Sequence, residues 1–193
     1  MPSMEFGSGP REYIKALRVL YDGNPNGKAF YDFILRNAQE KKKQDFTKEE
    51  QTELDHIFSQ RFPAKQCYAN AQTLAICNDD IDYVEGWVDS GLPIQIEHAW
   101  NALILRTDDE LTKILPKEFK HNAKTLYKQD EETKRFENAI YYGIKIPKKY
   151  MNRVVMDKKI HTSLLGEFYY HCIHPMQKGL APPRHCGDVH EYL

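Results

Sequence analysis

The chain has 193 residues, of which 41% are hydrophobic and 28% charged, a balance typical of one soluble globular domain. Lys and Arg number 27 and Asp and Glu 28, so the net charge of −1 lacks the basic excess of a protein that binds nucleic-acid backbones. No apolar run approaches the roughly 20 residues that span a bilayer, and the N-terminus lacks the basic-then-apolar pattern of a secretory signal. We therefore expect a soluble, cytoplasmic protein that binds neither nucleic acid nor membrane.

The first sixty residues have the apolar spacing of helices. Pro10 precedes one such segment, and a second amphipathic segment carries Phe33 and Ile34. The lysine-rich run 41–45 then indicates a solvated loop, and the capping-box spacing of Thr47 and Glu50 predicts another helix. We assign residues 1–60 to an N-terminal helical extension.

The middle of the chain changes its period. A helix is predicted over Cys67–Cys77, followed by two-residue alternation in segments 83–88, 94–105 and 140–146. Segment 107–120 is polar and helix-like, and segment 123–129 is a further candidate strand. This order of elements predicts an α+β protein with an antiparallel sheet.

Cys67 is the first candidate catalytic residue. The turn-like segment 61–64 and Pro63 place it at the start of the predicted helix. Backbone N–H groups and the helix dipole at such a position stabilise a thiolate, and the same N–H groups can donate to an oxyanion on an acyl substrate. A nucleophilic cysteine also needs a base. The alternative is a buried structural cysteine.

His98 is the candidate base. Alternation puts it on one strand face with Ile96 and Trp100, and Glu97 on the other face. A histidine on an apolar face is often a core residue. A strand histidine packed across a helix N-terminus, however, can take the proton of a thiol.

These motifs resemble those of papain-fold, transglutaminase-like thiol enzymes. The resemblance is carried in chain order by Cys67-Tyr-Ala-Asn-Ala71, Tyr83-Val-Glu-Gly-Trp-Val88, Glu97-His-Ala-Trp-Asn101 and Tyr141-Tyr-Gly-Ile144, and it covers about residues 60–147. It implies a Cys-bearing helix packed on an antiparallel sheet and a Cys-His-Asp triad with Cys67 and His98 in the first two roles.

The third member of the triad is open. The Asp-Pro-Thr segment common in such enzymes is absent from this chain. Asp130 follows a predicted strand in the family's order and is our first choice, whereas Asp108 and Asp109 lie nearer to His98 in sequence. Gln60 and Gln66 both precede Cys67, and either could donate to the oxyanion.

We expect Cys77 and the two tryptophans to have structural roles. Cys77 lies about three turns after Cys67 and is expected to pack in the core, as are Trp87 and Trp100 in their strands, unless the tryptophans line a substrate groove.

The tail concentrates the remaining thiols. Zinc ligation by Cys172, His174, Cys186 and His190, a disulfide, and an ordinary tail packed by Phe168, Tyr169 and Tyr170 are the three alternatives, and we favour the last. We therefore expect no metal and no cofactor.

We thus expect residues 61–193 to form the papain-like catalytic core with its C-terminal tail, in one compact domain with the extension. The expected activity is that of a thiol peptidase or amidase acting on proteins, peptides or amides. A transglutaminase or deamidase of the same fold, and a binding module without turnover, are the alternatives. A small interaction protein that uses zinc in the tail is a further alternative. No phosphate-binding glycine loop or His-Glu-x-x-His motif is present.

Overall fold

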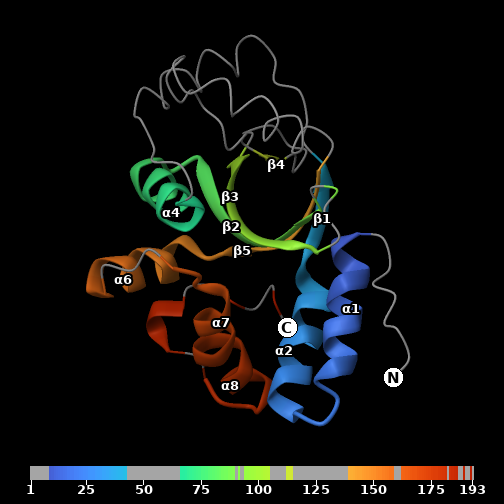
Figure 1. The fold of residues 1–193 in the computed structure, drawn as a ribbon. Coiled ribbons are helices and arrows are strands. Elements are labelled where there is room, and N and C mark those ends of the chain that lie inside the picture. Colours follow the sequence, from blue (N-terminus) through green and yellow to red (C-terminus); the bar gives the residue numbers. More distant parts are fainter. Residues whose placement is uncertain are drawn as a thin grey trace.

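The protein has an α+β fold in which one antiparallel sheet is covered by helices (Figure 1). The structure is a computed structural model, and it describes residues 9–42, 66–89, 91, 94–104, 112–114, 139–158, 162–181, 183–186, 189 and 192. The described helices are α1 (Pro10–Leu20), α2 (Pro25–Asn37), α4 (Cys67–Cys77), α6 (Lys148–Lys158), α7 (Leu165–Phe168) and α8 (His174–Gln177). Between α7 and α8 runs the π-helical segment η2 (Tyr169–Ile173), and η3 (Arg184–Cys186) is a short 3₁₀ helix.

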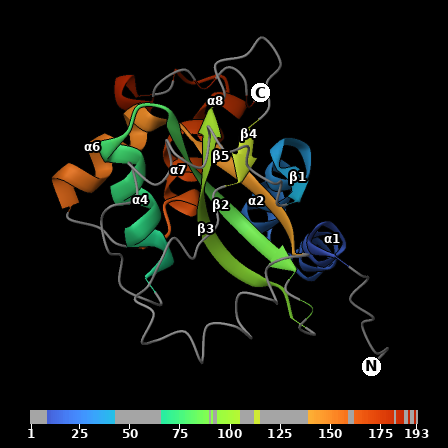
Figure 2. The same cartoon turned by 90° about the horizontal axis from the view of Figure 1, so that it is seen from above.

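The sheet has five strands in the order β1-β5-β2-β3-β4, and every neighbouring pair is antiparallel. The strands are β1 (Gln39–Lys42), β2 (Ile81–Asp89), β3 (Ile96–Ile104), β4 (Thr112–Ile114) and β5 (Ile140–Ile146). Figure 1 shows that they follow an arc, with the helices outside it, and Figure 2 shows the same sheet from above. The sheet therefore has a convex face covered by helices and a concave face.

The main core fills the space between the convex face and the helices. It takes Tyr83 and Trp87 from β2, Ala99 from β3, and the alternate residues Tyr142, Ile144 and Ile146 from β5. These positions alternate along each strand, as the pleat requires. Helices α1, α2, α4, α6 and α7 all contribute apolar side chains to this core.

A smaller apolar cluster lies on the concave face. Its members are Val84, Val88, Trp100, Ala102, Ala139 and Tyr141. Gly143 of β5 makes room for it, because a Cβ atom there would come within 2.3 Å of the Trp100 ring. The indole of Trp100 therefore lies over the neighbouring strands on this face.

The N-terminal segment is part of the sheet as well as of the core. Asn24 caps α2 by accepting from the N–H of Gly27 at 3.1 Å, and Ile14, Phe33 and Ile34 are fully buried in the main core. Strand β1 then pairs with β5. The lysine run was expected to be a loop, but Lys41 and Lys42 belong to this strand. Charged side chains are common on strands at the edge of a sheet, where they discourage pairing with other chains.

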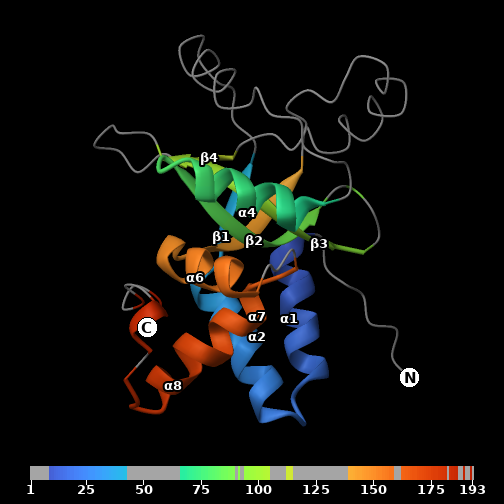
Figure 3. The same cartoon turned by 90° about the vertical axis from the view of Figure 1, so that its left-hand side faces the viewer.

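One other expectation about local structure needs correction. Thr112–Ile114, expected within a helix-like segment, pairs with β3 as strand β4. After Pro147, α6 follows β5 directly, and α7, η2 and α8 form a continuous helical stretch over residues 165–177. Figure 3 shows these helices beneath the sheet, with α4 lying across it. The apolar side chains of this stretch pack against the sheet, which stabilises helices that are short on their own.

Within the part of the chain that the structure describes, no helix combines the length and the apolar character needed to cross a membrane.

Candidate active site

Cys67 is the first residue of α4, as the sequence predicts. The helix spans 11 residues, and its first backbone hydrogen bond runs from the N–H of Asn70 to the carbonyl of Gln66 at 2.9 Å. The N–H groups of residues 67–69 therefore precede the helical hydrogen-bond ladder. The thiol of Cys67 is free and half-buried. The location of the proposed nucleophile at a helix start is confirmed, and its role stays a prediction.

Helix α4 is fastened to strand β3 by a buried side-chain amide. Asn101 donates from Nδ2 to the carbonyl of Ala71 at 2.9 Å and to the carbonyl of Asp82, in β2, at 3.2 Å. Ala71, Leu74 and Ala75 bury the same side of the helix in the main core. Helix α4 thus packs on the convex face, the face to which Ala99 and Asn101 point.

His98 lies on the other face of β3. The β2–β3 register runs without interruption from the pair Ile81–Leu103 to Val88–Ile96, so the side chains of β3 alternate regularly. His98 is opposite Gly86 and is buried, with 3% of its surface exposed. Its ring is stacked beside that of Trp100, with 6.3 Å between the ring centroids.

The expectation that His98 points at the Cys67 helix across one sheet face is therefore wrong. The physical reason is that alternation sorts side chains into two faces but does not say which face a helix covers. Here α4 covers the face of Ala99 and Asn101, and His98 shares the concave face with Trp100.

Cys67 and His98 nevertheless lie in the two elements that the Asn101 side chain joins. Ala71 follows Cys67 by four residues, which is about 6 Å along a helix. Asn101, which binds the Ala71 carbonyl, follows His98 by three residues, which is about 10 Å along a strand. Burial raises the pKa of the Tyr68 hydroxyl, and the charges of Glu85 and Glu97 raise it further. The start of α4 and the start of β3 lie on the same side of the Asn101–Ala71 hydrogen bond.

Among the described residues, β4 pairs only with Ala102–Ile104, and the stretch 96–101 is paired with β2 alone. Helix α4, which begins with Cys67, packs on the convex face of β3, and His98 lies on the concave face of the same strand.

The proposed third member of the triad lies elsewhere in the chain. Asp130, our first choice, and its alternatives Asp108 and Asp109 lie outside the described residues, as does Gln60. Gln66, the other candidate oxyanion donor, is the exposed N-cap residue of α4, and its side chain makes no capping hydrogen bond. Its amide is thus adjacent to Cys67.

The expectation for Cys77 is wrong, and those for the tryptophans are confirmed. Cys77 is the last residue of α4, and its thiol is exposed, because the helix buries its other side. Trp87 and Trp100 are both buried, Trp87 in the main core and Trp100 in the concave cluster.

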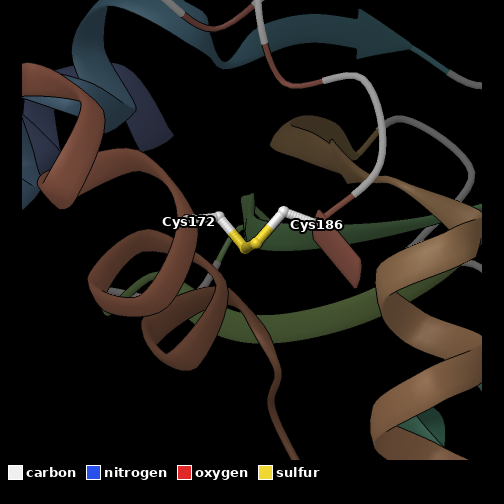
Figure 4. Close-up of a disulfide and its surroundings, with 2 residues drawn as sticks. All are labelled: Cys172 and Cys186. Atoms are coloured by element: carbon white, nitrogen blue, oxygen red, sulfur yellow. A yellow bond between two sulfur atoms is a disulfide. The ribbon is translucent and has the colours of Figure 1, made fainter. Parts of the chain in front are cut away.

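The two remaining cysteines form a disulfide between Cys172 of η2 and Cys186 of η3 (Figure 4). Both are fully buried. The disulfide was the least favoured of our three alternatives for the tail, and it excludes the proposed zinc set because the thiolates are no longer available as ligands. Phe168 and Tyr169 pack in the core as expected, whereas Tyr170 is exposed and His174 contacts both tyrosine rings.

Sequence reasoning missed a buried polar network next to α4. Glu85 of β2 accepts hydrogen bonds from the hydroxyls of Tyr83 and Ser163 and from the N–H groups of Leu164 and Leu165. The signal was available: Glu85 is a carboxylate between the apolar residues Tyr83 and Trp87 on one face of β2. Burial raises its pKa, and these four hydrogen bonds oppose the rise.

The same network reaches α4 through Gln72. Its Nε2 donates to the Tyr83 hydroxyl at 3.1 Å and to the carbonyl of Thr162 at 2.9 Å. The network therefore joins α4, β2 and the start of α7 on the convex face.

Comparison with known proteins found no family model, no curated protein and no solved structure that matches this chain.

Proposed function

We propose that this protein is a cysteine-dependent acyl-transfer enzyme, a thiol peptidase or amidase with a papain-like, transglutaminase-like core. Cys67 is the nucleophile and His98 the general base. The observation that carries the proposal is the Asn101–Ala71 hydrogen bond, which fastens the helix that begins with the half-buried free thiol of Cys67 to the strand that carries the buried His98. A nucleophile and its base must lie close together.

The reaction would proceed in two steps. His98 takes the thiol proton, and the Cys67 sulfur attacks the carbonyl carbon of an amide, forming a carbon–sulfur bond. The amide carbon–nitrogen bond then breaks, and the leaving amine takes the proton from the imidazolium. Water completes hydrolysis of the thioester, whereas an amine acceptor would make the enzyme a transglutaminase.

The α4 N-terminus supports stabilisation of the intermediate. The N–H groups of residues 67–69 have no acceptor within the helix and can donate to the oxyanion. Gln66 or Gln60 would add a side-chain donor, and Asp130 would orient the imidazole. We propose these roles on the order of the motifs alone.

The exposed thiol of Cys77 provides an internal control for a chemical test. The folded protein is treated with iodoacetamide near neutral pH, and modification of each cysteine is followed by mass spectrometry of its peptides. An activated Cys67 should react faster than Cys77 although it is less exposed, because the thiolate is the reacting species. His98→Gln should remove this advantage and leave the Cys77 rate unchanged. Equal rates for both thiols would contradict the proposal and favour a binding module without turnover.

A second assay separates the possible reactions. Peptide and amide libraries are incubated with and without a primary amine, and the products are identified by mass. New amines indicate hydrolysis, conversion of glutamine to glutamate indicates deamidation, and incorporation of the added amine indicates transglutamination. No product with any substrate, together with an unreactive Cys67, would contradict the enzyme proposal.

The expected cytoplasmic location also stays a prediction, and one observation opposes it. Disulfides such as Cys172–Cys186 are typical of oxidising compartments and rare in the cytosol. Alkylation of thiols during cell lysis, followed by mass spectrometry, would show the state of these cysteines in the cell. A fully reduced pair would favour the cytoplasm, and an intact disulfide would contradict that location.

A further inference from the structure

Asn101 holds an unusual position between the helix that carries Cys67 and the strand that carries His98. Its side chain is buried, with 7% of the residue exposed, and its amide nitrogen donates to two carbonyls at once, those of Ala71 in α4 and Asp82 in β2. It lies three residues after His98 and contacts α4 one turn after Cys67. A single side chain thus links the two elements of the proposed site.

These hydrogen bonds are not needed to complete the helix. The carbonyl of Ala71 lies inside α4, where the helical pattern supplies the N–H of residue 75 as its donor. The Asn101 amide is therefore an additional partner, and its bond fixes where α4 sits along β3. A purely apolar contact would fix this position less closely, because it is non-directional.

The other polar attachment of α4 leads away from β3. Gln72, the residue after Ala71, binds Tyr83 in β2 and the carbonyl of Thr162. It holds α4 against the centre of the sheet and the start of the C-terminal helices. The bond from Asn101 is the one that connects the helix to the strand of His98.

We propose that Asn101 is a positioning residue for the acyl-transfer site: by binding the carbonyl of Ala71 it sets the register of α4 on β3 and so the approach of the Cys67 thiol to His98. This inference rests on the proposed function. Asn101 does not contact substrate in this role. Its effect is to hold two reacting groups within the narrow range of separations at which proton transfer is effective.

The test uses Asn101→Leu, which keeps a branched side chain of similar shape and cannot donate. Because the two carbonyls have regular backbone environments, we expect the variant to fold. Asn101→Ala, which also cannot donate, is the second variant in case the larger leucine disturbs the core. Tyr83→Phe is the control: it removes the hydroxyl that binds Gln72 of the same helix and also donates to Glu85, and it leaves Asn101 intact.

Three quantities are measured on the full chain: the melting temperature, the iodoacetamide rate of Cys67 relative to Cys77, and the pH profile of the Cys67 rate. We expect Asn101→Leu to lower the relative Cys67 rate about tenfold or more, since a displacement of about 1 Å can cost a factor of about 100. Its pH profile should become that of an ordinary exposed thiol. Tyr83→Phe should lower the melting temperature and leave both the rate and the profile of Cys67 unchanged.

A double variant separates positioning from general destabilisation. In the wild-type background His98→Gln should slow Cys67, whereas in the Asn101→Leu background it should have little further effect, because the base is already out of reach. Additive effects of the two substitutions would contradict a positioning role.

The remaining outcomes distinguish this inference from the function on which it rests. If wild-type Cys67 reacts no faster than Cys77, the proposed function fails and the inference fails with it. If wild-type Cys67 is activated and both folded Asn101 variants react like wild type, only the inference fails. If neither variant folds, Asn101 is required for folding, and a specific positioning role is contradicted.

Discussion

Glu85 of strand β2 accepts a hydrogen bond from the backbone N–H of Leu165, 3.0 Å away, at the first residue of α7. The N–H of Leu164 and the Ser163 hydroxyl donate to the same carboxylate, each at 2.5 Å. One buried side chain of the sheet thus satisfies the N-terminal donors of the helical stretch 165–177. Helix starts leave such N–H groups without an intrahelical acceptor, so the sheet and the C-terminal helices are joined at this point.

Removal of this carboxylate should destabilise the whole fold. Glu85→Ala leaves the N–H groups of Leu164 and Leu165 buried without their acceptor, and we expect the free energy of unfolding to fall by about 3 kcal/mol or more, as measured by urea denaturation. Glu12→Ala is the control, since Glu12 pairs with Lys15 on the exposed surface of α1 and should change stability by less than about 1 kcal/mol. Equal effects of the two substitutions would show that the network is not a main determinant of stability.

The free energy of unfolding should depend on pH through the titration of Glu85. Burial raises the pKa of its carboxyl above the ordinary value, which means that the folded protein binds a proton at pH values where the unfolded chain has lost it. The stability linked to this proton is fully present below the ordinary pKa of glutamate and decreases as the pH rises through the raised pKa.

Urea denaturation of wild type and Glu85→Gln from about pH 4 to about pH 8 measures this contribution. The difference in unfolding free energy, wild type minus variant, should decline as the pH rises, because glutamine does not titrate. A difference that grows with pH would mean that the four hydrogen bonds to the carboxylate outweigh its burial.

The contact between Gly143 and Trp100 predicts a steric limit on the concave face. In Gly143→Ala the new methyl group would lie 2.3 Å from the Trp100 ring and 2.7 Å from the carbonyl oxygen of Glu85, so the sheet or the indole must move. We expect a loss of about 1–3 kcal/mol in unfolding free energy. Trp100→Phe should relieve only part of this loss, because the backbone contact remains.

Gly166→Ala is the matched control for this substitution. A Cβ atom at Gly166, within α7, would meet nothing within 4 Å, so the variant should be as stable as wild type or more stable by up to about 1 kcal/mol. If Gly143→Ala proves equally harmless, the indole does not occupy the position described.

The disulfide between Cys172 and Cys186 should stabilise the C-terminal part of the fold. It closes a loop with a sequence separation of 14, and removing such a crosslink costs about 3 kcal/mol through the entropy of the unfolded chain. The double substitution Cys172→Ala/Cys186→Ala should therefore lower the melting temperature, and a reducing agent should no longer affect it. Cys77→Ala, at an exposed site, should leave the melting temperature unchanged. Equal melting temperatures for wild type and the double variant would mean that this crosslink does not stabilise the fold.

Catalysis, if the proposed function holds, should depend on Cys67 and His98 together. Cys67→Ala and His98→Gln should each lower turnover of an amide substrate by orders of magnitude, and the double variant should lose little more, because the two groups act as a unit. Turnover is measured by product mass, with Cys77→Ala as the active control and melting temperatures recorded in parallel. Full activity of Cys67→Ala would exclude the thiol mechanism.

Local periodicity was sufficient to predict several elements from the sequence. The helix over Cys67–Cys77 and the strands β2, β3 and β5 agree with the predictions, because side-chain spacing along a helix or strand is set within a few residues. The α+β class follows from the order of these elements. The position of Cys67 at a helix start could be predicted for the same reason.

Only the tertiary structure decided how these elements meet. The alternation of side chains along β3 places His98 and Trp100 on one face, but it does not indicate which face α4 covers. The packing of Ala71, Leu74 and Ala75 against the convex face decides that. The pairing of β1 with β5, separated by about a hundred residues, and the meeting of Cys172 with Cys186 likewise depend on long-range contacts. The sequence by itself determined the segments with strong periodicity, since that depends on neighbouring residues, but not the short strands β1 and β4, which pairing in the sheet defines. Which segments touch was decided by burial of apolar surface from the whole chain, for which short-range spacing provides no signal.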